Sequence, residues 1–153
     1  MDYADKAEQL FKNGLNCAQA VSGAFSDLYP GISREIALNL ASPFGGGFAR
    51  KRQLCGAVSG MGIVYGMTLG THTVDEKMDT YEKSARMTDL FAERYGSIIC
   101  SELLEKTPED TLTPRESALS EQDKQAYHWP CIDYVRGAAQ LAEQYLSGLG
   151  IIK

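Results

Sequence analysis

Apolar residues recur along this chain at steps of three and four positions, which is the spacing of one face of an α-helix. The pattern is clearest in two segments: after Asn16 it comprises Ala18, Val21, Phe25 and Leu28, and after Pro130 it comprises Ile132, Val135, Ala139, Ala142 and Leu146. No segment of strand length alternates apolar and polar residues convincingly. The pattern therefore predicts an all-α protein, a single-domain helical bundle over residues 1–153.

Capping residues and helix breakers predict where the helices begin and end. The expected helices open near Asp2, Asn16, Ser33, Arg52, Thr73, Ser97, Ser120 and Pro130. Thr73 and Glu76 have the spacing of a capping box, and Gly96 is placed to end the long helix that follows. The stripe of that helix expected to face the core is Met78, Tyr81, Ala85, Thr88 and Tyr95. The polar stretch 105–119 contains Pro108 and Pro114 and is expected to be a loop.

The helix expected from about Arg52 to Leu69 is rich in glycine. Its glycines recur at intervals of four, as Gly56 and Gly60 and as Gly62, Gly66 and Gly70. Each costs about 1 kcal/mol of helix propensity relative to alanine. We therefore expect a neighbouring helix or a cofactor to approach this backbone closely. The uncharged stretch 54–70 is short for a membrane span of about 20 residues, so a buried helix is the better interpretation.

Composition and charge narrow the classes of partner. The net charge is −5 and the isoelectric point is near 5.0, which does not favour binding to nucleic acid or to an anionic membrane. The opening residues MDYADKAEQLF lack the apolar region of a secretory signal. We therefore expect a cytoplasmic protein, in which persistent structural disulfides are rare.

The cysteines are Cys17, Cys55, Cys100 and Cys131, and each falls in the predicted first turn of a different helix. None belongs to a C-x-x-C pair, which removes the usual zinc-ribbon and thioredoxin spacings. From spacing alone they are small buried side chains. A helix N-terminus, however, favours the thiolate and lowers the pKa of a cysteine. If the four helix ends converge, they form a pocket suited to an iron–sulfur cluster held by thiolates.

The segments NCAQAV around Cys17 and FGGGFARKRQLCGAVSG around Cys55, followed by Cys100 and Cys131, resemble the C_GCAxxG_C_C family of redox-active proteins. In the family name a glycine precedes the central cysteine and an alanine follows it, whereas here leucine precedes Cys55 and glycine follows it. The resemblance implies an all-helical domain and redox chemistry through the four cysteines. It also implies iron–sulfur binding in relatives fused to cytochrome-like modules, but it supplies no substrate or partner.

The glycines near Cys55 are expected to bring backbone close to the cofactor. These candidate cofactor-binding residues are Gly45, Gly46, Gly47 and Gly56. The basic residues between them are Arg50, Lys51 and Arg52. This segment could bind an anion at a helix N-terminus, but it lacks both the Lys-Ser/Thr of a P-loop and a preceding strand. We expect the basic residues to dock an acidic redox partner instead.

Three functions remain open. In the first, the four cysteines are redox-active ligands of an iron–sulfur cluster used in electron transfer. In the second, a metal-free pair such as Cys17 and Cys55 cycles between dithiol and disulfide. In the third, the cysteines hold a structural zinc ion in a non-catalytic module. If the protein is an enzyme, we expect an oxidoreductase. Its expected partner is a redox protein or a small-molecule electron donor or acceptor. The sequence also leaves open that the protein forms a homodimer.

Adjacent to the last cysteine, His128 could form a catalytic pair with Cys131. Residues this close at a helix start seldom point toward each other, so packing or a surface position is the preferred role for the histidine.

Overall fold

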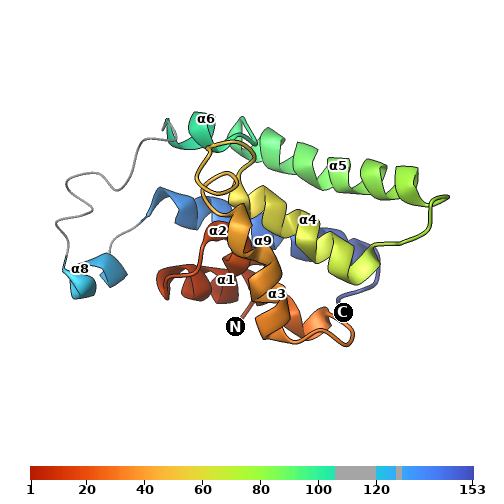
Figure 1. Ribbon diagram of the computed structural model, residues 1–153, viewed down its shortest axis with the longest axis horizontal. Helices are drawn as coiled ribbons and strands as arrows, with labels where there is room; N and C mark the ends of the chain where they lie inside the picture. The colour runs from red at the N-terminus through yellow and green to blue at the C-terminus, as the bar shows by residue number, and fades with distance from the viewer. Residues whose placement is uncertain (106–119, 127–128) are drawn as a thin grey trace.

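The computed structural model describes residues 1–105, 120–126 and 129–153 (Figure 1). Within these ranges the helices are α1 (Tyr3–Lys12), α2 (Cys17–Ala24), α3 (Arg34–Ala41), α4 (Gly56–Leu69), α5 (Lys77–Tyr95), α6 (Cys100–Leu104), α8 (Glu121–Ala126) and α9 (Pro130–Gly148), with 3₁₀ turns η1 (Ser26–Leu28) and η2 (Ser42–Phe44). Among the described residues the one β-type pairing is an isolated antiparallel bridge between Leu54 and Ile99. The all-α prediction is confirmed.

Helix α2 lies at the centre of the fold and packs against α1, α3, α4 and α9. It can be enclosed on several sides because its sequence, CAQAVSGA, consists mainly of small and apolar residues. The largest fully buried side chains among the described residues include Phe25, Met61, Phe91, Ile132 and Leu146. Helix α5 runs along α4 and α9 on the outer side of the bundle (Figure 1).

The predicted core faces of α2 and α9 are confirmed, whereas that of α5 is wrong at Met78, Tyr81 and Ala85 and holds at Tyr95, which packs against the core. Met78 and Tyr81 are 67% and 60% exposed, and Met87 and Phe91 are the buried residues of this helix. Both buried residues belong to the C-terminal half of α5. The buried face of α5 is therefore determined by packing of its C-terminal half. The sequence prediction used a stripe along the whole helix and so identified a different face.

Local capping signals predict several helix ends correctly. Asn16 and Gln19 form a capping box, in which each side chain accepts the backbone N–H of the other residue at 2.9 and 3.1 Å. Asp2 and Ser33 cap α1 and α3. Gly96 ends α5 with a left-handed φ of 85°.

Two predicted caps are wrong. The hydroxyl of Thr73 bonds to the carboxylate of Glu76 rather than to backbone, and α5 begins at Lys77. Ser97 accepts the N–H of Ile99, so it orders the turn before α6 without being its N-cap. In both cases the side chain stabilises the preceding loop.

Helix α4 begins at Gly56 and not near Arg52. The residues before it form a left-handed loop, which we define as residues 46–52. Its residues with positive φ are Gly46 (64°), Gly47 (71°), Phe48 (66°), Ala49 (47°), Arg50 (62°) and Arg52 (59°). A right-handed helix cannot include such residues, so α4 starts only after the chain has returned to negative φ.

The expected close approach to the glycines of α4 is confirmed at its N-terminal half. A Cβ on Gly60 would lie 2.7 Å from Cβ of Val21, and one on Gly56 would lie 3.0 Å from Cβ of Cys17. At Gly62 and Gly66 a Cβ would meet no atom within 4 Å. Helix α2 therefore packs on the N-terminal part of α4, and no atom of the described residues requires glycine at Gly62 or Gly66, whereas a Cβ on Gly70 would clash with the backbone of Gly66.

Among the helices that the structure describes, none is both long and apolar enough to cross a membrane. The predicted loop lies almost entirely outside the described residues, as do Tyr127 and His128. The possible pairing of His128 with Cys131 therefore lies outside the described residues.

Candidate functional site

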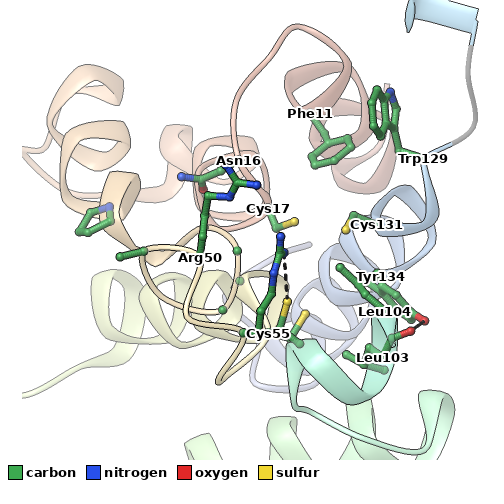
Figure 2. Close-up of a pocket in the computed structure, with 18 of the residues that line it drawn as sticks. Phe11, Asn16, Cys17, Arg50, Cys55, Leu103, Leu104, Trp129, Cys131 and Tyr134 are labelled. Carbon is green, nitrogen blue, oxygen red and sulfur yellow. Dashed lines mark hydrogen bonds between the residues drawn. The ribbon is translucent and has the colours of Figure 1, made fainter. Parts of the chain in front are cut away.

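All four cysteines line one cavity of about 600 Å³ (Figure 2). Cys17 and Cys100 are the first residues of α2 and α6, Cys55 is the N-cap of α4, and Cys131 is the second residue of α9. The predicted position at four helix N-termini is therefore observed. The convergence of these ends is also observed, while the roles of the cysteines as ligands or redox groups stay predictions.

Cys55 and Cys100 are brought together by pairing of the segments that precede their helices. The N–H of Cys55 donates to the carbonyl of Ile98 at 2.8 Å, and the N–H of Cys100 donates to the carbonyl of Gln53 at 2.6 Å. These bonds flank the bridge between Leu54 and Ile99. Two cysteines far apart in sequence thus occupy neighbouring positions in a fixed backbone frame.

Asn16 holds the wall of the cavity next to Cys17. Besides its role in the capping box, its side-chain amide donates to the carbonyl of Ser42 at 2.9 Å. A Cβ on Gly45 would lie only 2.5 Å from Cβ of Asn16. Asn16 therefore anchors the glycine segment directly against the start of α2.

The glycines expected near the cofactor do lie on the cavity wall: Gly45, Gly46, Gly47 and Gly56. A Cβ on Gly47 would lie 2.7 Å from Cβ of Cys100, while Gly56 has the similar contact with Cys17 already described. Because Gly47 and Gly56 have no side chains, the left-handed loop can pack closely against Cys100, and α4 can pack closely against Cys17. Contact between these glycines and a cofactor remains a prediction.

Arg52 is a residue of the site whose position the sequence did not predict. Its side chain is only 7% exposed, and its guanidinium donates to Sγ of Cys100 at 3.8 Å (Figure 2). Arg50 also lines the cavity but is exposed, and Lys51 is exposed and does not line it. Helical periodicity could not predict that Arg52 is buried while Arg50 and Lys51 are exposed. These residues lie in the left-handed loop, and its backbone determines where their side chains point.

The pKa values of two thiols move opposite to the expectation for a helix N-terminus. The pKa of Cys17 is well above its usual value, first because of a hydrogen bond with Cys131, and then because of burial and the nearby thiols. Burial raises the pKa of Cys55 to about 12, although the backbone N–H groups of Val58 and Ala57 act in the opposite direction. The hydrogen bond with Cys131 and burial raise the pKa of Cys17, and burial raises that of Cys55, so at these two residues the predicted lowering of the pKa is wrong.

The donor chemistry of the site suits a metal, but its ligands are not arranged around one point. Over residues 1–105, 120–126 and 129–153, no three His, Cys, Asp or Glu residues form a group that could hold an ion. All four cysteines belong to these ranges, and no disulfide joins any two of them. The site is thus a set of four thiols around a shared cavity.

The fold and the cavity define an all-α protein with a four-cysteine site. Over residues 15–145 the chain matches the family described as Putative redox-active protein (C_GCAxxG_C_C). The chain belongs to this family, and the resemblance seen in the sequence is confirmed. No curated protein and no solved structure matches the chain.

Proposed function

We propose that this chain is a small electron-transfer protein of the oxidoreductase class, in which Cys17, Cys55, Cys100 and Cys131 hold an iron–sulfur cluster. The observation that carries the proposal is the position of all four thiols on one cavity wall, each at the start of a different helix. Four thiolates are the usual ligand set of such clusters, and the bound cluster would supply one-electron transfer.

The surroundings of the sulfurs support this ligand set. Backbone N–H groups of Ala57 and Val58 interact with the sulfur of Cys55, and the guanidinium of Arg52 donates to Cys100. Hydrogen bonds of this kind stabilise cluster sulfurs and adjust their reduction potential. The sulfurs still have to approach one another, and we expect rotation of the cysteine side chains on cluster loading to accomplish this.

The raised pKa values of Cys17 and Cys55 favour a role as metal ligands over a role as free thiolate nucleophiles. Because the thiols of Cys17 and Cys55 stay protonated near neutral pH, they are weak nucleophiles in the metal-free protein. Metal binding replaces each thiol proton by a cation, which removes much of the cost of a buried negative charge. A cation-bound centre therefore suits this cavity better than free thiolates do.

A second candidate function is dithiol–disulfide cycling between Cys17 and Cys131. The observation that favours it is the thiol–thiol hydrogen bond between these two residues. It points to this pair rather than to Cys17 and Cys55, which the sequence suggested as an example. In that case two thiols lose two protons and pass two electrons to an external acceptor, such as the disulfide of a redox partner, as their sulfurs form a bond.

The deciding experiment is purification without oxygen, followed by an optical spectrum and assays for iron, zinc and acid-labile sulfide. We expect broad visible absorption with matching iron and sulfide, which is lost when any one cysteine is replaced by serine. Ser101→Ala is the matched control, because Ser101 follows Cys100 on α6 but does not line the cavity. This variant should retain the cluster.

The alternative outcomes identify the other functions. Colourless, iron-free protein overturns the cluster proposal. Zinc in that protein would indicate a structural site, as the sequence left open. Metal-free protein that forms a reversible Cys17–Cys131 disulfide, identified by peptide mass spectrometry, would establish the dithiol function.

A further inference from the structure

We infer that the cavity beside the four sulfurs binds a small organic anion with an apolar body, in position to react with the cysteine centre. This inference rests on the proposed redox function of the cysteines, since it names the class of small molecule on which they act. The cavity volume of about 600 Å³ falls within the range of roughly 300–1,000 Å³ that is typical of small-molecule sites.

One side of the cavity is cationic. Arg52 lies buried in its wall with a guanidinium N–H directed at Cys100, and Arg50 lines the same wall nearer to solvent. Figure 2 places Arg50 beside Asn16, at the edge opposite Phe11 and Trp129. Guanidinium groups bind carboxylates and phosphates through paired N–H donors, so this side fits the anionic group of a ligand.

The arginines are held there by strained backbone. In the left-handed loop Phe48, Ala49, Arg50 and Arg52 have positive φ, a conformation in which residues other than glycine are strained. The N–H groups of Arg50 and Arg52 donate to the carbonyls of Gly45 and Gly46 at 3.2 and 3.0 Å. Strain of this kind concentrates at functional sites, where it pre-organises the groups that bind.

The opposite side of the cavity is apolar and aromatic. It includes Phe11, Trp129 and the ring of Tyr134, and Figure 2 shows Cys17 and Cys131 between this side and Arg50. The hydroxyl of Tyr134 donates to the carbonyl of Leu103 at 3.1 Å, so its ring is the part available to a ligand. A ligand spanning both sides would therefore place an apolar body next to the sulfurs.

These positions change the expected role of the basic residues. Arg52 cannot meet the surface of an acidic partner protein, because its side chain is buried in the cavity wall. A small anion inside the cavity reaches both arginines, whereas Lys51 is exposed and lies outside this wall. Lys51 is thus a matched control for the effect of positive charge alone.

The test uses the full-length, reduced, metal-free protein and three disulfide probes. These are the aromatic dianion 5,5′-dithiobis(2-nitrobenzoate), the neutral aromatic 4,4′-dithiodipyridine and the dication cystamine. In each reaction a cysteine thiolate attacks one probe sulfur, the probe S–S bond breaks, and one half leaves as a thiolate. A second cysteine then displaces the other half, so the protein gains one disulfide and loses two protons. Each rate is divided by that of the same probe with free cysteine.

We expect the normalised rate with the dianion to exceed that with cystamine by about tenfold or more. Arg50→Gln and Arg52→Gln should each reduce this preference severalfold, while Lys51→Gln should leave it unchanged. Arg50 is exposed, so Arg50→Gln keeps the test valid if Arg52→Gln fails to fold. The neutral aromatic probe should react equally with the parent protein, Arg50→Gln and Lys51→Gln, and its rate with Arg52→Gln measures the separate effect of that guanidinium on the Cys100 thiolate.

Two results would overturn the inference: equal normalised rates for the three probes, or an equal loss of preference in Lys51→Gln. Iron and sulfide assays on the same variants separate this inference from the proposed function. If no protein loads a cluster but the preference depends on Arg50, the anion site stands and the cluster proposal falls. If clusters load normally without any preference for the dianion, the anion site falls alone.

Discussion

The guanidinium of Arg52 donates to Sγ of Cys100 at 3.8 Å from a side chain that is 7% exposed. A buried cation next to a cysteine sulfur favours the more negative state of whatever centre that sulfur belongs to. The two residues are fixed to each other through backbone as well, because the N–H of Ser101 donates to the carbonyl of Arg52 at 3.1 Å. Arg52 is therefore built into the cysteine site and is not a mobile surface charge.

Replacement of Arg52 should shift the reduction potential of the cluster-loaded protein. Without the guanidinium, the reduced and more negative state loses stabilisation, so Arg52→Met should move the midpoint to more negative potential. Arg52→Lys, which keeps the charge, should shift it less. Redox titration followed by visible absorption measures the midpoint. Lys51→Met is the control, and an equal shift in that variant would contradict a direct role of Arg52.

The stability of the reduced, metal-free protein should fall at alkaline pH because of Cys55. The folded thiol keeps its proton up to a pKa of about 12, whereas an unperturbed thiol titrates near 9.0. Between these values the unfolded state binds fewer protons, so the free energy of unfolding falls as pH rises, by up to about 1.4 kcal/mol per pH unit. The contribution is fully present below about pH 9, and the raised pKa of Cys17 acts in the same direction.

Urea unfolding on both sides of pH 9 tests this dependence. Cys55→Ala should lose stability less steeply than the parent protein, because it lacks the titrating thiol. Groups that do not interact with Cys55 titrate equally in both proteins, so their effects cancel in the comparison. The charge of Cys55 raises the pKa values of Cys17 and Tyr134, and loss of that interaction changes the slope in the same direction. Equal slopes in the two proteins would contradict the burial of a neutral thiol at this position.

The sequence could predict the parts of the fold that depend on local chemistry. The caps at Asn16 and Ser33 and the proline at the start of α9 each act within one helical turn. These signals set the starts of α2 and α9, which carry Cys17 and Cys131, and the start of α3, which carries no cysteine. The position of Cys17 and Cys131 at helix N-termini could therefore be predicted from local signals, whereas the starts expected near Arg52 and Ser97 placed Cys55 and Cys100 only approximately.

What the sequence could not predict depends on contacts between distant segments. The left-handed loop is held by its own unusual turn and by pairing with residues 98–101, so neither its backbone nor the burial of Arg52 has a local signal. The hydrogen bond of Cys17 with Cys131 depends on how α2 meets α9. The prediction of the buried face of α5 failed for the same reason. Only the C-terminal half of this helix packs against the core, and its buried residues are Met87 and Phe91.

Two glycines of α4 should respond in opposite directions to alanine. At Gly60 the new Cβ would lie 2.7 Å from Cβ of Val21, so Gly60→Ala should destabilise the protein by about 1–3 kcal/mol. Gly62 is exposed and a Cβ there meets nothing within 4 Å, so Gly62→Ala should stabilise the helix by up to about 1 kcal/mol. Urea unfolding measures both, and a stable Gly60→Ala variant would contradict the close packing of α2 on α4.

Asn16 should matter to the cavity wall beyond its role as a helix cap. Asn16→Ala and Ser33→Ala each remove one N-cap and should each cost about 1 kcal/mol. Asn16→Ala also removes the 2.9 Å bond to the carbonyl of Ser42 and the amide group that lies next to Gly45, although it keeps Cβ. Amide hydrogen exchange in residues 42–47 should therefore become faster in Asn16→Ala and stay unchanged in Ser33→Ala. If both variants exchange like the parent protein there, Asn16 stabilises α2 alone and another contact must hold the glycine segment against Cys17.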